Sequence, residues 1–166
     1  MPPSNTGLLQ SDRSRATPGY RIFSPLGLTS TLLINMSGEV VNSWDLPYEP
    51  GNYGYLLPSG NMLSAVRTPD GPKGLPAKGG LMQEWDWDGN LLWEFQDNLQ
   101  HHDFRRCKNG NTLYLRWELM REENHKRVQG GKQGSEHADG IWSDVVREID
   151  PSGKVVWEWR AEDCEE

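Results

Sequence analysis

Two adjacent histidines, His101 and His102, are followed directly by Asp103 and precede an Asn-Gly turn. An imidazole can donate or accept a proton near neutral pH, and it can attack an electrophile. A neighbouring carboxylate can fix its tautomer and orientation. Because adjacent side chains of a strand point to opposite faces, we expect one imidazole to face a site and the other to support it. The alternative is a loop pair in which one ring simply bonds to Asp103.

Other groups suit this chemistry less well. His102, Asp103 and His137 do not have the spacing of a zinc site. The segment 86–90, DWDGN, lacks the glycine and the glutamate of a calcium loop. The sequence therefore predicts no metal and no cofactor. We take Asp103, Arg116 and His137 as candidate substrate-binding or supporting residues around the catalytic candidates His102 and His101.

The elements that must position these groups recur along the chain. Three segments match when aligned on a glycine: INMSGEVVNSW (34–44), WDWDGNLLWEF (85–95) and IDPSGKVVWEW (149–159). Each has Asn or Asp three residues before the glycine, two aliphatic residues after it and a large aromatic residue six after it. A glycine turn between residues that favour strands predicts a β-hairpin.

A second hairpin recurs between the first ones, as GYLLPSGNMLSAVR (54–67) and FRRCKNGNTLYLRW (104–117). The two kinds alternate, and each returns after about 50 residues, except that the last interval, from Gly89 to Gly153, is 64 residues because a polar, Gly-rich loop is inserted in it. Two hairpins in that length make four strands, which is the size of one β-propeller blade.

The pattern predicts an all-β chain of four-stranded, propeller-type blades, with a β-sandwich as the alternative. We expect a flexible lead-in over 1–19, a partial propeller over 20–166 and an inserted surface loop over 119–140. The predicted blade units cover about 20–68, 79–118 and 141–166. About two and a half repeats are fewer than the four to eight blades that close a ring. The sequence therefore indicates an incomplete, truncated propeller, completed either by missing C-terminal blades or by copies in a homo-oligomer.

The repeat also supplies an internal comparison for the histidines. When the second hairpins are aligned, four polar side chains of the later copy replace unrelated residues of the earlier one: His101 for Gly51, His102 for Asn52, Asp103 for Tyr53 and Arg116 for Val66. Packing of the shared scaffold does not require these groups. A repeat scaffold acquires function by exchanging such residues.

Composition excludes several classes of partner. A formal charge of −7 argues against nucleic-acid binding, which requires a basic face. No apolar run is long enough to cross a membrane, and the first residues lack an apolar signal core, so we expect a cytoplasmic chain as written. Cys107 and Cys164 could be free thiols or one bridge.

The chain resembles the bacterial arylsulfotransferase family. The resemblance extends from about Gly19 to Trp159 and is most specific where SGEVVNSWDLP precedes GYLLPSGN and HHDF precedes NGNTL. It implies a six-bladed propeller with a central active site, small-molecule aryl sulfate and phenol as substrates, and proteins that are often exported. It also implies that a histidine carries the sulfuryl group between them. HHDF matches the family's first channel histidine, a role we assign to His102, with His101 as the alternative.

The resemblance leaves part of the catalytic apparatus outside this chain. The family's nucleophilic histidine and its arginine lie in later blades, which nothing here matches. We therefore expect a fragment of an arylsulfotransferase-like transferase that is inactive by itself. The alternative is a non-catalytic propeller that serves as a binding or interaction scaffold.

Overall fold

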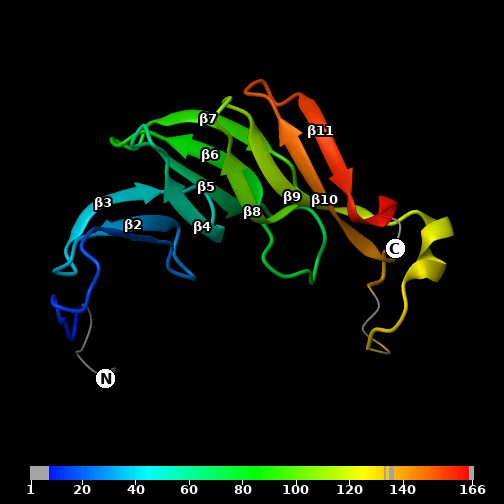
Figure 1. The fold of residues 1–166 in the computed structure, drawn as a ribbon, viewed down its shortest axis with the longest axis horizontal. Coiled ribbons are helices and arrows are strands. Elements are labelled where there is room, and N and C mark those ends of the chain that lie inside the picture. The colour runs from blue at the N-terminus through cyan, green and yellow to red at the C-terminus, as the bar shows by residue number, and fades with distance from the viewer. Residues whose placement is uncertain (1–7, 133, 135–136, 165–166) are drawn as a thin grey trace. The chain divides into compact units, whose positions relative to one another are not determined.

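The computed structural model describes residues 8–132, 134 and 137–164, and in this part of the chain antiparallel strands dominate, with two short 3₁₀ helices (Figure 1). The prediction of an all-β fold is confirmed. The chain divides into two compact units, Met1–Arg67 with Met82–Glu94, and Thr68–Leu81 with Phe95–Glu166. No helix among the described residues is long and apolar enough to cross a membrane.

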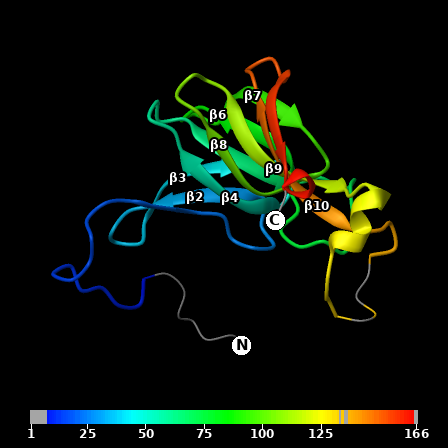
Figure 2. The same ribbon diagram turned by 45° about the vertical axis from the view of Figure 1, so that its right-hand side comes forward.

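The first unit contains a three-stranded sheet and most of a four-stranded sheet (Figure 2). The three-stranded sheet has the order β1 (Arg21–Phe23), β2 (Ser30–Ile34) and β3 (Val40–Asp45). The four-stranded sheet has the order β4 (Pro50–Leu56), β5 (Met62–Arg67), β6 (Gly80–Trp85) and β7 (Leu91–Gln96). The core of the first unit is built from five fully buried side chains, those of Trp44, Met62, Leu63, Val66 and Met82.

The second unit is organised around a four-stranded sheet of β8 (Gln100–Arg106), β9 (Thr112–Leu119), β10 (Trp142–Ile149) and β11 (Val155–Arg160). Phe104, Tyr114, Val145 and Ile149 form its buried core. The predicted insertion joins β9 to β10 and contains the 3₁₀ helix η1 (Glu122–Arg127).

The sheets group the hairpins differently from the predicted blade units. Each four-stranded sheet starts with a second hairpin and ends with the next first hairpin, so that it covers 50–96 or 100–160 and not 79–118. A repeating pattern has no intrinsic starting point. The spacing of the glycines therefore fixed the period but could not fix which hairpins share a sheet.

The glycine turns form as the repeat predicts. Gly38, Gly89 and Gly153 have φ angles of 77°, 84° and 87°, which suit glycine. In the last two turns, Asp86 and Asp150 each accept hydrogen bonds through Oδ1 from the backbone N–H groups two and four residues later. Hydrogen bonds to these carboxylates, led by those from Asn90 and Ser152, lower the pKa of both groups.

The described parts of the lead-in and of the insertion both contact the sheets or their ends. Leu8 lies against Gly38, and residues 1–7 of the predicted lead-in fall outside the described residues.

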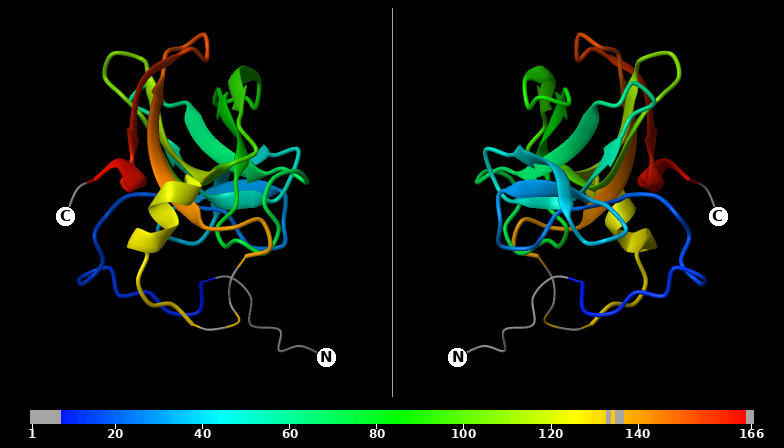
Figure 3. Two further views of the ribbon diagram at one scale, coloured as in Figure 1. Left: turned by 90° about the vertical axis from the view of Figure 1, so that its right-hand side faces the viewer. Right: turned by 90° about the vertical axis from the view of Figure 1, so that its left-hand side faces the viewer.

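The carboxylate of Glu162, in the C-terminal 3₁₀ helix η2 (Ala161–Asp163), accepts hydrogen bonds from Arg121 N, Arg121 Nε and Asn124 Nδ2 at 3.0, 2.9 and 3.1 Å. These bonds hold η1 beside η2 (Figure 3). Cys107 and Cys164 are free thiols.

Candidate imidazole site

The two histidines lie at a β-bulge in the second unit. His101 pairs with Leu115 of β9, but the next register pair joins Phe104 to Tyr114, so His102 and Asp103 lie between two successive pairs. His102 has a φ of 49°, and its N–H donates to the carbonyl of Ala77 at 2.9 Å. A left-handed backbone at a residue other than glycine is uncommon and costs energy. The fold therefore holds His102 in a disfavoured conformation.

The bulge brings the two imidazoles together. His101 Nδ1 and His102 Nδ1 are 2.8 Å apart, and the rings are nearly perpendicular, at 88°. We expected neighbouring side chains to point to opposite faces, and this expectation was wrong. The alternation of a regular strand does not apply across a bulge, where the strand bends and a side chain is turned in a new direction.

His101 is the buried member of the pair. Its exposed fraction is 3%, and its ring stacks on Trp117 with centroids 4.2 Å apart. Burial lowers its pKa to about 4, although the nearby Asp144 carboxylate acts in the opposite direction. His101 is therefore neutral at pH 7.

Asp144 faces the other nitrogen of His101. Its Oδ1 lies 3.3 Å from His101 Nε2, within ion-pair distance but outside the geometry of a hydrogen bond. A carboxylate only accepts protons in hydrogen bonds, so it favours the tautomer with a hydrogen on His101 Nε2. His101 Nδ1 must then accept from His102 Nδ1–H. This arrangement leaves a lone pair on His102 Nε2, and His102 is exposed.

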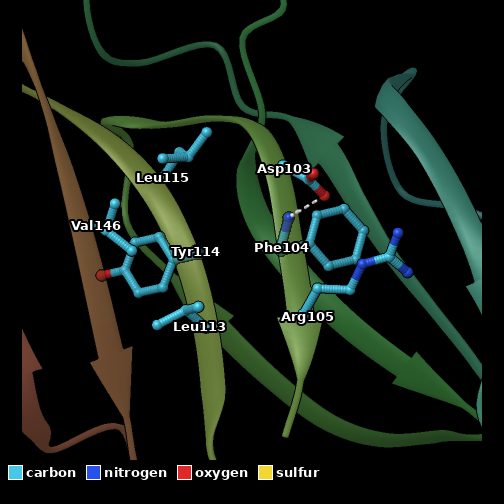
Figure 4. Close-up of a pocket in the computed structure, with 7 residues that line it drawn as sticks. All are labelled: Asp103, Phe104, Arg105, Leu113, Tyr114, Leu115 and Val146. Atoms are coloured by element: carbon cyan, nitrogen blue, oxygen red, sulfur yellow. Dashed lines mark hydrogen bonds between the residues drawn. The ribbon is translucent and has the colours of Figure 1, made fainter.

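Asp103 is not the aspartate that orients His101. Its Oδ1 accepts a hydrogen bond from the backbone N–H of Phe104 at 2.9 Å, as Figure 4 shows. The orienting group, Asp144, comes from β10, beyond the insertion, and sequence reasoning missed it. It pairs with Trp117 across the sheet, but in the sequence nothing connects Asp144 to the histidines.

Arg116 lies on the face of the sheet opposite to His101. It follows Leu115, the partner of His101, along β9, and successive residues alternate between faces. Its Nε donates to Asp97 Oδ2 and its Nη1 to Glu118 Oε2, both at 2.8 Å. The Arg116 charge is thus balanced by two carboxylates, away from the imidazole pair.

These contacts belong to a closed ring of alternating charges. Going round it, the members are Asp97, Arg116, Glu118, Arg160, Glu158 and Arg147, which ion-pairs again with Asp97. Three cations balance three anions. The ring links β9, β10 and β11 to the segment that leads into His101.

His137 lies in a cleft of about 610 Å³ with Lys73, Leu99 and Trp142. Both of its ring nitrogens are engaged: Nε2 donates to the Lys73 carbonyl at 2.8 Å, and Nδ1 accepts from Trp142 Nε1 at 3.1 Å. His137 therefore shapes the cleft and has no free nitrogen for proton transfer. Leu99, which also lines this cleft, lies two residues before His101 in the chain.

The described residues contain no group of three His, Cys, Asp or Glu side chains arranged to hold a metal ion. The polar groups of the candidate site are the two imidazoles and the Asp144 carboxylate, and Lys73 is a polar residue of the cleft that His137 lines.

Comparisons with known proteins give a likeness of fold. No family model and no curated protein matches the chain. A crystal structure of a protein of unknown function from Bacteroides caccae is similar over 87% of this chain, with a TM-score of 0.51 and 17% identity. The matched region is 46% of that protein, so this chain spans about half of its length.

Proposed function

We propose that this chain is the N-terminal part of an arylsulfotransferase-like β-propeller, in which His102 exchanges a proton with the phenolic oxygen during sulfuryl transfer. The observation that supports this role is the line from Asp144 through His101 to His102. The Asp144 carboxylate favours a hydrogen on His101 Nε2, which makes His101 Nδ1 the acceptor of the His102 Nδ1–H and leaves the exposed His102 Nε2 available to a ligand. Comparable lines of carboxylate and imidazole orient general bases in hydrolases.

The fold is compatible with the propeller part of the proposal. Two sheets of four antiparallel strands follow one another in simple order, and the hairpins repeat after about 50 residues, as blades do. The likeness to half of a longer bacterial protein agrees with further blades. Such blades would supply the nucleophilic histidine and the arginine that the family resemblance implies.

The proposed reaction balances in two steps. In the first, a histidine nitrogen of a further blade attacks sulfur, the S–O(aryl) bond breaks, and the leaving phenolate takes a proton from protonated His102. In the second, the acceptor phenol gives its proton to neutral His102 as its oxygen attacks sulfur and the N–S bond breaks. His102 thereby returns to its protonated form.

The cleft lined by Leu99, His137 and Trp142 provides complementary binding groups. Trp142 offers an aromatic edge or face to an aryl ring, and Lys73 offers a cation to the sulfate oxygens. His101, neutral and buried, keeps the orientation of His102 independent of pH near neutrality.

The proposal is tested by NMR titration of the full chain with 4-nitrophenyl sulfate, observing the histidine ring signals. We expect the His102 signals to shift on binding, and His102→Gln to weaken binding at least tenfold. The matched control is His125→Gln, since His125 bonds to the Met120 carbonyl within the insertion. Methyl sulfate tests the need for the ring, and glucose tests sugar binding by the tryptophans.

Two results would overturn the proposal. The first is binding of 4-nitrophenyl sulfate that is unchanged by His102→Gln. The second is the absence of any binding, which would favour the alternative of a non-catalytic scaffold. We expect no turnover from this chain alone, because the attacking histidine comes from another blade.

A further inference from the structure

The cleft that contains His137 is built from separate stretches of the second unit. Lys73 belongs to the connection between β5 and β6, Leu99 lies between β7 and β8, and Trp142 is the first residue of β10. The volume of the cleft, about 610 Å³, is within the range of pockets that hold small molecules.

Hydrogen bonds and one close backbone contact fix the walls of this cleft. The His137 ring donates to the Lys73 carbonyl and accepts from Trp142 Nε1, so it joins the connection to the start of β10. Gly71 approaches Asn98 so closely that a Cβ on the glycine would clash with the Asn98 carbonyl oxygen. The cleft is therefore a preformed site, in which a ligand does not have to order the loops around it.

Two residues of opposite charge, Lys73 and Asp139, line the cleft, and both are exposed. The Asp139 carboxylate lies 3.6 Å from His137 Nδ1, but this nitrogen already accepts from Trp142 Nε1 and from the Asp139 backbone N–H. The ring hydrogen of His137 is on Nε2, so the ring is neutral and does not balance the Asp139 charge. Among the described residues, no other side chain forms an ion pair with Asp139 or with Lys73.

Apolar groups lie in the same cleft as the two charges. Leu99 and Trp142 contribute large side chains to its lining, and Pro72 is buried. An aromatic ring can pack on these groups while its substituents meet Lys73 and Asp139. This composition suits an aromatic molecule that bears both an anionic and a cationic group.

We propose that Asp139 makes the cleft selective for aryl sulfates whose ring carries an ammonium group, with the sulfate at Lys73 and the ammonium at Asp139. This inference rests on the proposed function, from which the aryl sulfate comes, and it adds the chemistry of the rest of the substrate. The Asp139 side chain is 58% exposed, so its effect on affinity is moderate. An exposed ion pair changes an affinity by about two- to fivefold.

Isothermal titration calorimetry of the full chain compares tyramine O-sulfate with 4-ethylphenyl sulfate, which lacks only the amino group. At low ionic strength and near neutral pH, we expect the dissociation constant of tyramine O-sulfate to be lower by about threefold. The ratio of the two constants should approach one at about 1 M salt, because electrostatic interactions there extend over about 3 Å.

Four variants assign the effect to its residues. Asp139→Ser should make the two dissociation constants equal, and Asp139→Lys should reverse their order. Glu123→Gln is the matched control, because it removes one negative charge from an exposed position of η1 outside the lining of the cleft, and it should keep the ratio. Lys73→Gln should weaken both sulfates alike, since they carry the same anionic group. An unchanged NMR signal of Trp142 Nε1–H in each variant verifies that its contact with His137 persists.

Equal affinities of the two sulfates for the unsubstituted chain would overturn the selection by Asp139, and so would a ratio that persists in Asp139→Ser. Both results leave the proposed function in place, because His102→Gln tests it independently. If neither sulfate bound, this inference and the proposed function would both be rejected.

Discussion

The left-handed backbone at His102 predicts an unusual order of stability between glycine and alanine. Both His102→Gly and His102→Ala lose the 2.8 Å contact with His101, so this loss cancels in their comparison. At a φ of 49°, the Cβ of alanine costs about 1–2 kcal/mol, which glycine avoids. Glycine loses about 0.5–1 kcal/mol more chain entropy on folding. We therefore expect the glycine variant to be more stable, by about 0.75 kcal/mol at the middle of these ranges and by about 1.5 kcal/mol at most.

Urea denaturation of the two variants measures this difference, provided that their m-values agree. Asp103 supplies the control: it occupies the same bulge and is not among the residues with positive φ. Asp103→Ala should be more stable than Asp103→Gly, in the usual order. If alanine were at least as stable as glycine at position 102, the backbone of His102 would not be held as described, and the geometry of the imidazole pair would have to be rejected.

Three further predictions concern ionisable side chains with little exposure to solvent. Asp97→Ala removes an acceptor from Tyr114 Oη and Arg116 Nε and should cost about 3 kcal/mol of unfolding free energy in thermal or urea melts, whereas a change within 0.5 kcal/mol would contradict the charge ring. The pKa of Glu162 is lowered, first by its hydrogen bond from Asn124, so its stabilising effect is complete above the ordinary glutamate pKa and is lost as pH falls through the lowered value. Urea midpoints from pH 6 to pH 3 should therefore fall less steeply for Glu162→Gln than for the unsubstituted chain. The pKa of His101 is lowered to about 4, so stability should decrease as pH falls from 6.5 toward 4, and its NMR signals should not titrate above pH 5; a midpoint near 6.5 would contradict its burial.

Local sequence chemistry predicted much of the fold. Asn or Asp three residues before glycine specifies a turn in which one side-chain oxygen accepts two backbone N–H groups, and this geometry forms at Asn35, Asp86 and Asp150. Alternation of strand residues then defines the hairpins. The grouping of hairpins into sheets was not predictable in this way, because it depends on packing between repeats that look alike in sequence.

The site was predictable only in part. The adjacency of His101 and His102 marked its position, but their contact depends on a bulge and on Ala77, 25 residues earlier, which also has a positive φ of 52°. Asp144 reaches His101 through the register of β9 and β10, across an insertion of no fixed length. Arg116 resembled a substrate-binding cation in the sequence, yet its partners Asp97 and Glu118 neutralise it. Long-range pairing decides such roles.

The bulge itself belongs to the repeated scaffold and not to the histidines. In the first unit, β4 also loses register with β5 at the matching place, between Pro50 and Gly54, where the intervening residues are Gly51, Asn52 and Tyr53. Two sheets with unrelated side chains thus bulge at the same point. The scaffold provides an irregular backbone at which His102 and Asp103 lie outside the regular alternation of the sheet, whereas His101 keeps its pairing with Leu115 and stacks on Trp117. An imidazole within the bulge, His102, and a buried imidazole beside it, His101, convert this structural irregularity into a candidate site.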